Sequence, residues 1–155
     1  STVAIPGHVI QVVQGTTSTA VAVTSAGSYV DTGLSASITP VSTTSKILVI
    51  CNQPCRIKRD SQYVNVLGWQ VLRNSTSIYE PATGFDFGMV IPTGTGNEIS
   101  QVMTSSYLDS PSLTTAITYK TQIQLRVDTN NASVTANQVF DQSAHSTITL
   151  MEIAG

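Results

Sequence analysis

Two histidines are the side chains of this 155-residue sequence best suited to proton transfer near neutral pH. His8 and His145 are far apart in the chain, and neither has ligand-type neighbours at metal-binding spacing, so we expect no metal site. His145 lies in the stretch DQSAHST, where Asp141 with Ser143 or Ser146 supplies the residue types of a hydrolytic triad. No nucleophile elbow of the form Gly-x-Ser-x-Gly accompanies them. The sequence therefore favours a hydrogen-bonded loop histidine just before the last strand.

Carboxylates are the second group that could do chemistry. The nine acidic residues are scattered singly along the chain. Asp86 with Glu80 or Asp109 could form the carboxylate pair of a glycosidase, but the sequence gives no specific sign of such a pair. We expect that the chain is not an enzyme, has no catalytic residue and uses no cofactor.

Cys51 and Cys55 are the two cysteines of the chain. Four residues apart on an extended strand, their Cα atoms would lie about 13 Å apart, which is beyond the reach of a disulfide. Pro54 lies between them and can bend the chain, so a disulfide stays open as the alternative. Two buried, unreactive thiols fit the sequence better.

Three further groups of side chains are candidates for contact with a receptor or partner. The basic stretch CRIKR, residues 55–59, either ends a solvated strand or contacts a phosphate or an anionic sugar. An aromatic side chain such as Trp69 can stack on a sugar, although Trp69 shares a strand face with apolar neighbours and is expected in the core. The glycine-rich stretch 92–98 lacks the Lys and the helix of a phosphate loop and is expected to be an exposed loop. The candidate contact residues are Tyr63, Trp69, Arg56, Lys58, Arg59, Thr95 and Asn97.

The composition predicts one folded domain with a hydroxyl-rich surface. Charged residues make up 10% of the chain, against about 25% in typical globular domains, while 41% are hydrophobic. We expect a single domain over residues 1–155, with 1–7 as a short N-terminal arm. The net charge of −2 gives no reason to expect binding to nucleic acid, and no apolar run is long enough for membrane insertion. The start of the chain lacks the features of a secretory signal, so we expect assembly in a cytosol.

A hydrophobic period of two residues predicts the elements that must position these side chains. Between 117 and 127, odd positions are mostly apolar and even positions are polar, which is typical of a strand with one buried face. Asp109-Ser110-Pro111 before it is typical of a turn, because Pro fixes φ and Asp or Ser can bond neighbouring amides. Many short strands without helix signals predict an all-β, antiparallel β-sandwich that is jelly-roll-like. The expected strands are 9–13, 20–24, 34–38, 46–51, 64–72, 85–91, 99–103, 117–127 and 147–153.

The two terminal segments predict self-association. Residues 9–13 and 147–153 are both strongly strand-forming and apolar. Termini are usually the loosest part of a domain unless something holds them, and an uncovered apolar sheet edge promotes aggregation. We therefore expect identical copies of the chain to cover these edges in a homo-oligomer.

Five stretches, in order, resemble the β-sandwich domain of tail-fibre and other virion surface proteins of bacteriophages, notably those of marine bacteria and cyanobacteria. They are QVVQ near the start, SITPVSTTSKILV at 37–49, VLRNSTSIY at 71–79, SYLDSPSLTTAITYKTQ at 106–122 and STITLMEIA at 146–154. The resemblance runs from about residue 8 to residue 155. The stretch CNQPCRIKRDSQ departs from it, because the family has Gly-rich or less basic sequence there.

The resemblance implies a non-enzymatic structural protein of a phage virion, trimeric and displayed on the virion surface after assembly in the bacterial cytoplasm. It fits either a capsid decoration (cement) protein or a tail-fibre head, which would stabilise the particle or mediate host attachment. Its expected partners are two further copies in a homotrimer and other capsid or tail proteins. The alternative is a lectin-like receptor-binding module, whose loops 92–98 and 129–137 would recognise host surface glycans.

Overall fold

The computed structural model describes residues 5–59, 65–81, 90–91, 97–126 and 132–155. Every regular element in these ranges is a β-strand, which confirms the predicted all-β class. No helix there is long and apolar enough to cross a membrane. The strands are β1 (Val9–Thr17), β2 (Val21–Val23), β3 (Val30–Ile38), β4 (Lys46–Arg59), β5 (Asn65–Arg73), β6 (Thr76–Tyr79), β7 (Val90–Ile91), β8 (Asn97–Asp109), β9 (Ile117–Leu125), β10 (Ser133–Ala136), β11 (Gln138–Val139), β12 (Gln142–Ser143) and β13 (Ser146–Ile153).

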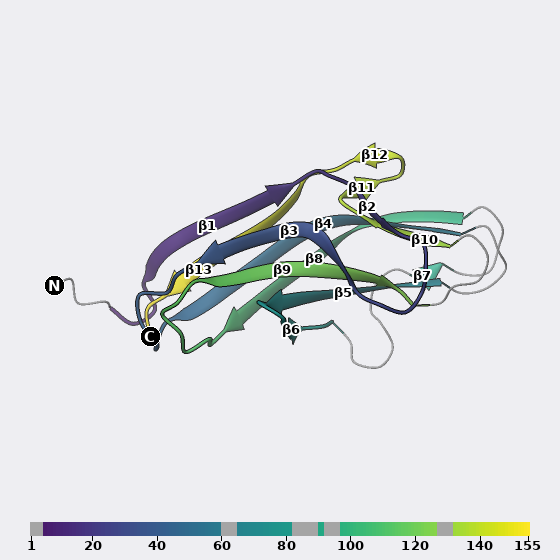
Figure 1. The fold of residues 1–155 in the computed structure, drawn as a ribbon. Coiled ribbons are helices and arrows are strands. Elements are labelled where there is room, and N and C mark those ends of the chain that lie inside the picture. Colours follow the sequence, from purple (N-terminus) through teal and green to yellow (C-terminus); the bar gives the residue numbers. More distant parts are fainter. Residues whose placement is uncertain (1–4, 60–64, 82–89, 92–96, 127–131) are drawn as a thin grey trace.

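Two antiparallel sheets pack face to face as a sandwich, and β11 and β12 form a separate two-stranded hairpin (Figure 1). In the first sheet the main order is β1-β13-β4-β8, and the short strands β10 and β2 extend it beside the second half of β4. In the second sheet the order is β3-β9-β5-β6, with β7 beside the start of β5. Eight strands make up the two sheets without the short additions: β1, β3, β4, β5, β6, β8, β9 and β13. In this chain order the first pairs with the last (β1 with β13), the second with the seventh (β3 with β9), the third with the sixth (β4 with β8) and the fourth with the fifth (β5 with β6). This is the wiring of a jelly roll, as the sequence predicted.

Strand β4 is longer than the predicted strand 46–51. Every second residue still faces the core at Gln53, Cys55 and Ile57, which are all buried. The strand therefore continues to Arg59. On one side of β4, β13 pairs as far as Asn52 and β10 pairs from Cys55. Pro54 falls between these two partners, where a missing backbone N–H is tolerated.

Strand β8 is also longer than predicted, and it corrects the expected turn at Asp109. The strand extends from Asn97 to Asp109, so Asp109 belongs to its last residue pair with β4. The Asp109 carboxylate is buried and accepts hydrogen bonds from Arg73 Nη1 at 3.0 Å and Tyr119 Oη at 2.7 Å. It therefore connects the first sheet to the second instead of bonding its own turn. Of the predicted strand 85–91, only β7 lies within the described residues.

The inward-facing residues of both sheets form one apolar core. Trp69 is 1% exposed and meets the Tyr79 ring edge-on, with ring centroids 6.5 Å apart, so its predicted place in the core is confirmed. At one side of the sandwich, β1 approaches β3 very closely. A Cβ atom at Gly15 would overlap the backbone carbonyl of Ser35, so only glycine fits there.

One of the fully buried polar side chains, that of Asn137, is the centre of a hydrogen-bond network in this core. Asn137 is 0% exposed and has a left-handed φ of 60°. Its Nδ2 donates to the carbonyl oxygens of Thr19 and Thr32, each at 2.8 Å. Its Oδ1 accepts from Gln53 Nε2 at 2.8 Å and from Ser146 Oγ at 2.7 Å. All four hydrogen-bonding positions of the amide are therefore used.

The network reaches the second sheet directly at Thr32 on β3 and a second time through Gln53. Gln53 Oε1 accepts a 2.8 Å hydrogen bond from Trp69 Nε1 on β5. The backbone of Asn137 is held as well, since its N–H donates to the Pro54 carbonyl at 2.8 Å and its carbonyl accepts from Ala144 N at 2.9 Å. The Asn137 amide thus ties together the segment before β2 and strands β3, β4, β5 and β13.

We predict that Asn137→Ala lowers the free energy of unfolding by at least about 3 kcal/mol, because it leaves several buried polar groups without partners. Asn74→Ala is the matched control: Asn74 also has a positive φ, 54°, but lies exposed in a turn, where its Oδ1 accepts a hydrogen bond from the Thr118 N–H at 3.0 Å. Its loss should cost only about 1 kcal/mol, from the left-handed backbone and this solvent-exposed bond. Urea unfolding followed by Trp69 fluorescence measures both values, and equal losses for the two variants would contradict the role of the buried network.

Candidate functional site

Arg56 is the centre of a charged cluster on the outer side of β4. Its Nε lies 2.7 Å from Glu98 Oε1, and its Nη2 donates to Glu98 Oε2 at 2.7 Å. Its Nη1 lies 2.8 Å from Asp141 Oδ1 and donates to Gln138 Oε1 at 3.3 Å. Glu98 comes from β8, whereas Gln138 and Asp141 come from the hairpin β11–β12. The guanidinium group therefore holds this hairpin against the sheet with charge-assisted hydrogen bonds.

This cluster corrects one part of the sequence interpretation. The basic stretch 55–59 was expected to end a solvated strand, but Arg56 is only 8% exposed because the hairpin β11–β12 covers it. Lys58, two residues further on, is exposed as expected. The difference arises because the carboxylates that pair with Arg56 are far away in the sequence and become its neighbours only in the folded chain.

Phe140 lies at the tip of the hairpin and was not singled out from the sequence. It is 58% exposed and has a φ of 49°, a left-handed conformation that is unfavourable for a large side chain. Its backbone N–H donates to Ser100 Oγ on β8 at 2.8 Å. Together with the Arg56 contacts to Gln138 and Asp141 on either side, this bond fixes the turn. The result is an aromatic ring held in solvent by a rigid support.

The other predicted contact residues differ in how far the structure describes them. Trp69 is in the core, away from any surface. Arg59 and Asn97 pair across β4 and β8 at the same end of the first sheet as Arg56 and Lys58, but their side chains lie outside the described structure. Tyr63 and Thr95 lie outside the described residues altogether. Of the predicted side chains that the structure describes, Arg56 and Lys58 lie at the end of the first sheet that carries the hairpin.

Two of the residues that could have formed a hydrolytic triad make contacts with other residues instead. Asp141 pairs with Arg56, and Ser146 is buried and donates to Asn137. His145 and Ser143 are exposed. Asp109, one of the possible glycosidase carboxylates, is engaged by Arg73 and Tyr119, and Asp86 lies outside the described residues. Within the described ranges, no three His, Cys, Asp or Glu side chains gather as a metal site would require.

Cys51 and Cys55 are both free and buried, so the disulfide alternative is wrong. Burial raises the pKa of the Cys51 thiol to about 11, against a smaller opposing effect of its hydrogen bond with Ser105. Burial raises the pKa of Cys55 further still. Because the thiolate is the reactive form, both cysteines act as small core residues.

Glu152 is a fully buried carboxylate at the opposite end of the sandwich. It accepts hydrogen bonds from Gln11 Nε2 on β1 and, at 2.8 Å, from the backbone N–H of Val41. Burial alone would raise its pKa, but these donors together outweigh that effect and hold the pKa below its ordinary value of 4.5. The carboxylate thus anchors the β3–β4 connection to β1 and β13.

We predict that Glu152→Gln removes part of the acid sensitivity of the fold. A lowered pKa stabilises the folded state above about pH 4.5, and this contribution is lost as the pH falls through the folded-state value. Urea unfolding at pH 7 and pH 3 should show a smaller difference for Glu152→Gln than for the wild type. Asp31→Asn is the comparison, since Asp31 also has a lowered pKa through its hydrogen bond with Lys120 but is half exposed and screened by solvent. A larger effect for Asp31→Asn than for Glu152→Gln would contradict this assignment.

Together, fold and site define a class of protein: an antiparallel jelly-roll domain with a clamped, aromatic-tipped hairpin. A scan of the sequence against protein-family models finds no match, and a search of curated proteins finds none either. The resemblance to phage virion proteins therefore stays a prediction from the sequence.

Proposed function

We propose that this chain is a non-enzymatic structural protein of a bacteriophage virion, a homotrimeric surface component that decorates the capsid or forms the head of a tail fibre. The observation that carries the proposal is the jelly-roll wiring, which recurs in viral capsid and lectin domains. A fold by itself is compatible with many functions, so the roles of the individual polar groups must agree with it.

Five of the six described carboxylates support a structural role, and the sixth, Glu80, is partly buried. Asp109 and Glu152 are buried and fully engaged in contacts between segments. Glu98 and Asp141 hold Arg56, and Asp31 holds Lys120. A general acid or base needs a proton-transferring group that faces a substrate, whereas these five groups face other side chains of the same chain. In this arrangement the carboxylates stabilise the fold, as expected for a structural component of a particle.

The surface chemistry agrees with exposure to variable salt. Four ion pairs are found among the described residues, while hydroxyl and amide side chains make most of the side-chain hydrogen bonds. Neutral hydrogen bonds and apolar packing are little affected by ionic screening, in contrast to surface ion pairs. A virion protein with such a surface would keep its shape and its contacts outside the host cell.

We predict that the purified protein has three times the mass of one chain in size-exclusion chromatography with light scattering. The trimer should persist at about 1 M salt, where the Debye length is about 3 Å, because its contacts are expected to be largely uncharged. Mass spectrometry of purified particles from the source should detect the chain in stoichiometric amounts. A monomer at all micromolar concentrations would contradict the homotrimer, and absence from the particles would contradict the virion role.

Phe140 supports a second candidate function, a lectin-like receptor-binding module. An aromatic ring can stack on the apolar face of a sugar, and polar neighbours can bond its hydroxyls. The exposed carboxylate of Asp141 and the exposed side chain of Gln142 lie directly after Phe140 in the hairpin. Since Arg56 fixes this hairpin in advance, little conformational freedom would be lost on binding.

We predict that, in this second case, Phe140→Asn lowers glycan affinity about tenfold, the equivalent of 1.4 kcal/mol for a lost stacking contact. Asn tolerates the left-handed backbone, so the variant should be at least as stable as the wild type. Leu113→Asn removes another exposed apolar side chain, 40% exposed, and should leave glycan binding unchanged. A glycan array followed by calorimetry of any hit measures this, and a wild-type protein that binds no glycan would exclude the lectin function.

A further inference from the structure

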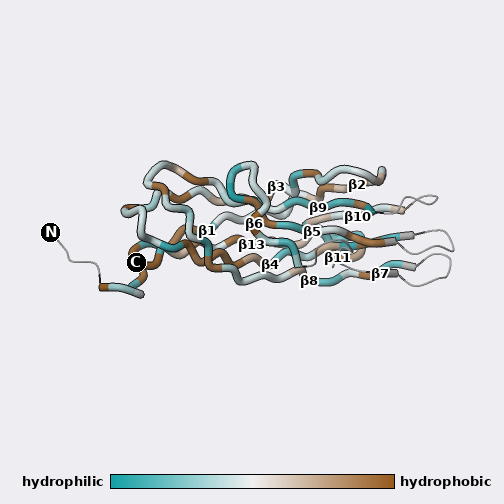
Figure 2. Tube along the Cα trace, turned by 90° about the horizontal axis from the view of Figure 1, so that it is seen from below, coloured by the Kyte–Doolittle hydropathy of each residue, from teal (hydrophilic) through white to brown (hydrophobic). Residues whose placement is uncertain are grey.

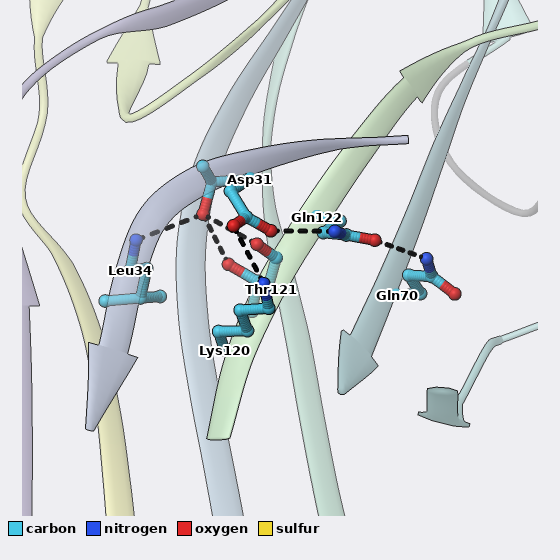
Figure 3. A network of polar contacts seen from close by, with 7 residues as sticks. Asp31, Leu34, Gln70, Lys120, Thr121 and Gln122 are labelled. Atoms are coloured by element: carbon cyan, nitrogen blue, oxygen red, sulfur yellow. Dashed lines mark hydrogen bonds and ion pairs between the residues drawn. The ribbon is translucent and has the colours of Figure 1, made fainter. Parts of the chain in front are cut away.

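The two outer faces of the sandwich differ in how far their polar groups are satisfied. On the second sheet, polar side chains link three adjacent strands (Figure 3). Gln70 Nε2 donates to Gln122 Oε1 at 2.7 Å, and Gln122 Nε2 donates to Asp31 Oδ1 at 2.7 Å. Lys120 Nζ lies 2.8 Å from Asp31 Oδ2. This face therefore carries a continuous hydrogen-bonded polar layer that suits contact with water.

The outer face of the first sheet carries an apolar row instead. Strand register places Val12 beside Met151, Met151 beside Leu48, and Leu48 beside Leu108, across all four main strands. Val12 is 55% exposed and Leu108 is 48% exposed, while the two central residues are partly exposed. Figure 2 shows apolar segments of β13 and β4 in this half of the molecule.

The next rows on this face are uncharged. We define the neutral face as three successive rows of outward-facing residues on β1, β13, β4 and β8, in which pairing places each residue beside the next. The rows are Val12, Met151, Leu48 and Leu108; then Gln14, Thr149, Ile50 and Ser106; then Thr16, Thr147, Asn52 and Thr104. None of these twelve side chains has a charge, and all four in the first row are apolar, which a water-facing strand does not require.

The neutral face continues into an unpaired strand edge. Strand β8 pairs with β4 along its whole length and with no other strand in the described part of the chain. Within the described residues, no strand pairs with the backbone groups on the other side of this 13-residue strand. Two exposed apolar residues, Val102 at 49% and Leu108 at 48%, lie on this strand. Soluble proteins normally cover or charge such an edge, and β8 has a charged residue only near each end.

We propose that neighbouring copies of this chain cover both surfaces, the neutral face of one subunit packing against the β8 edge of the next. This inference rests on the proposed homotrimer and states how it is built. Identical copies carry identical charges, so contact between them is most favourable where a surface has none, which is the case on the neutral face. A contact between two different surfaces is heterologous, and it closes into a ring when three copies are related by a threefold axis.

The neutral face is smaller than a complete interface. Four strands about 4.8 Å apart and five residues with a rise of about 3.3 Å give a flat footprint of about 320 Å². A standard interface buries about 800 Å² of each partner, more than this face alone supplies. In the ring, each subunit contributes the face to one neighbour and the β8 edge to the other, so both surfaces are buried in every subunit.

The experiment compares lysine substitutions on the two sheets. Val12→Lys and Leu108→Lys place a charge in the apolar row at positions exposed enough to keep the fold. We expect each to weaken trimer association roughly a hundredfold in sedimentation equilibrium, because like charges and desolvated ammonium groups then meet in the interface. Val30→Lys is the matched control, since Val30 is 39% exposed on β3 of the other sheet, and it should leave association unchanged. Circular dichroism and thermal unfolding verify that each variant is folded.

The outcomes separate this inference from the proposed function. A trimeric wild type with monomeric, folded Val12→Lys and Leu108→Lys variants supports the interface. A trimeric wild type whose two variants associate with unchanged affinity overturns the interface and leaves the trimer standing, whereas a monomeric wild type overturns both. If the variants do not fold, hydrogen exchange of the wild type decides: amides of β8 must exchange more slowly in the trimer than in the diluted monomer, and unchanged exchange overturns the inference.

Discussion

The fully bonded amide of Asn137 is the constraint on which the architecture depends. A polar group buried in an apolar core is costly unless every donor and acceptor finds a partner, and here each partner belongs to a different segment. The arrangement is met only when β3, β4 and β13 are in their native register. It joins the two sheets twice, through the Asn137 bond to Thr32 on β3 and through the Trp69 N–H that Gln53 accepts. Apolar packing supplies most of the stabilisation of the sandwich, while this network specifies one alignment of the sheets.

The same residue connects the core to the surface. The hairpin β11–β12 begins immediately after Asn137, and its first residue, Gln138, already contacts Arg56. The Asn137 N–H bonds the carbonyl of Pro54, two residues before Arg56. The core network therefore fixes the position of Arg56 on β4 and the start of the hairpin that carries Phe140. A ring held in this way loses little freedom when it meets a partner, which is the physical reason that a strained, exposed aromatic residue is of interest.

The molecule is asymmetric in the way its two sheets meet the outside. The Gln70–Gln122–Asp31 layer joins the outer polar groups of one sheet to each other. The other sheet presents the apolar row and the β8 edge, which pairs with no further strand within the described residues. Such surfaces agree with the proposed assembly of several copies. This asymmetry links the fold to the proposed virion role, because an assembled particle requires one surface for neighbours and another for solvent.

The sequence by itself determined the class of fold, because alternation of apolar and polar residues is a local property that a strand expresses wherever it lies. The sequence also located Trp69 in the core, because Leu67 and Val71, its neighbours on the same strand face, are both apolar. Strand lengths, the burial of Arg56, the cross-sheet role of Asp109 and the site at Phe140 were decided only by tertiary structure. In each case the partner is distant in the chain: Glu98 for Arg56, and Arg73 for Asp109. Local periodicity says which side of a strand faces inward, but the pairing of strands decides which groups meet there.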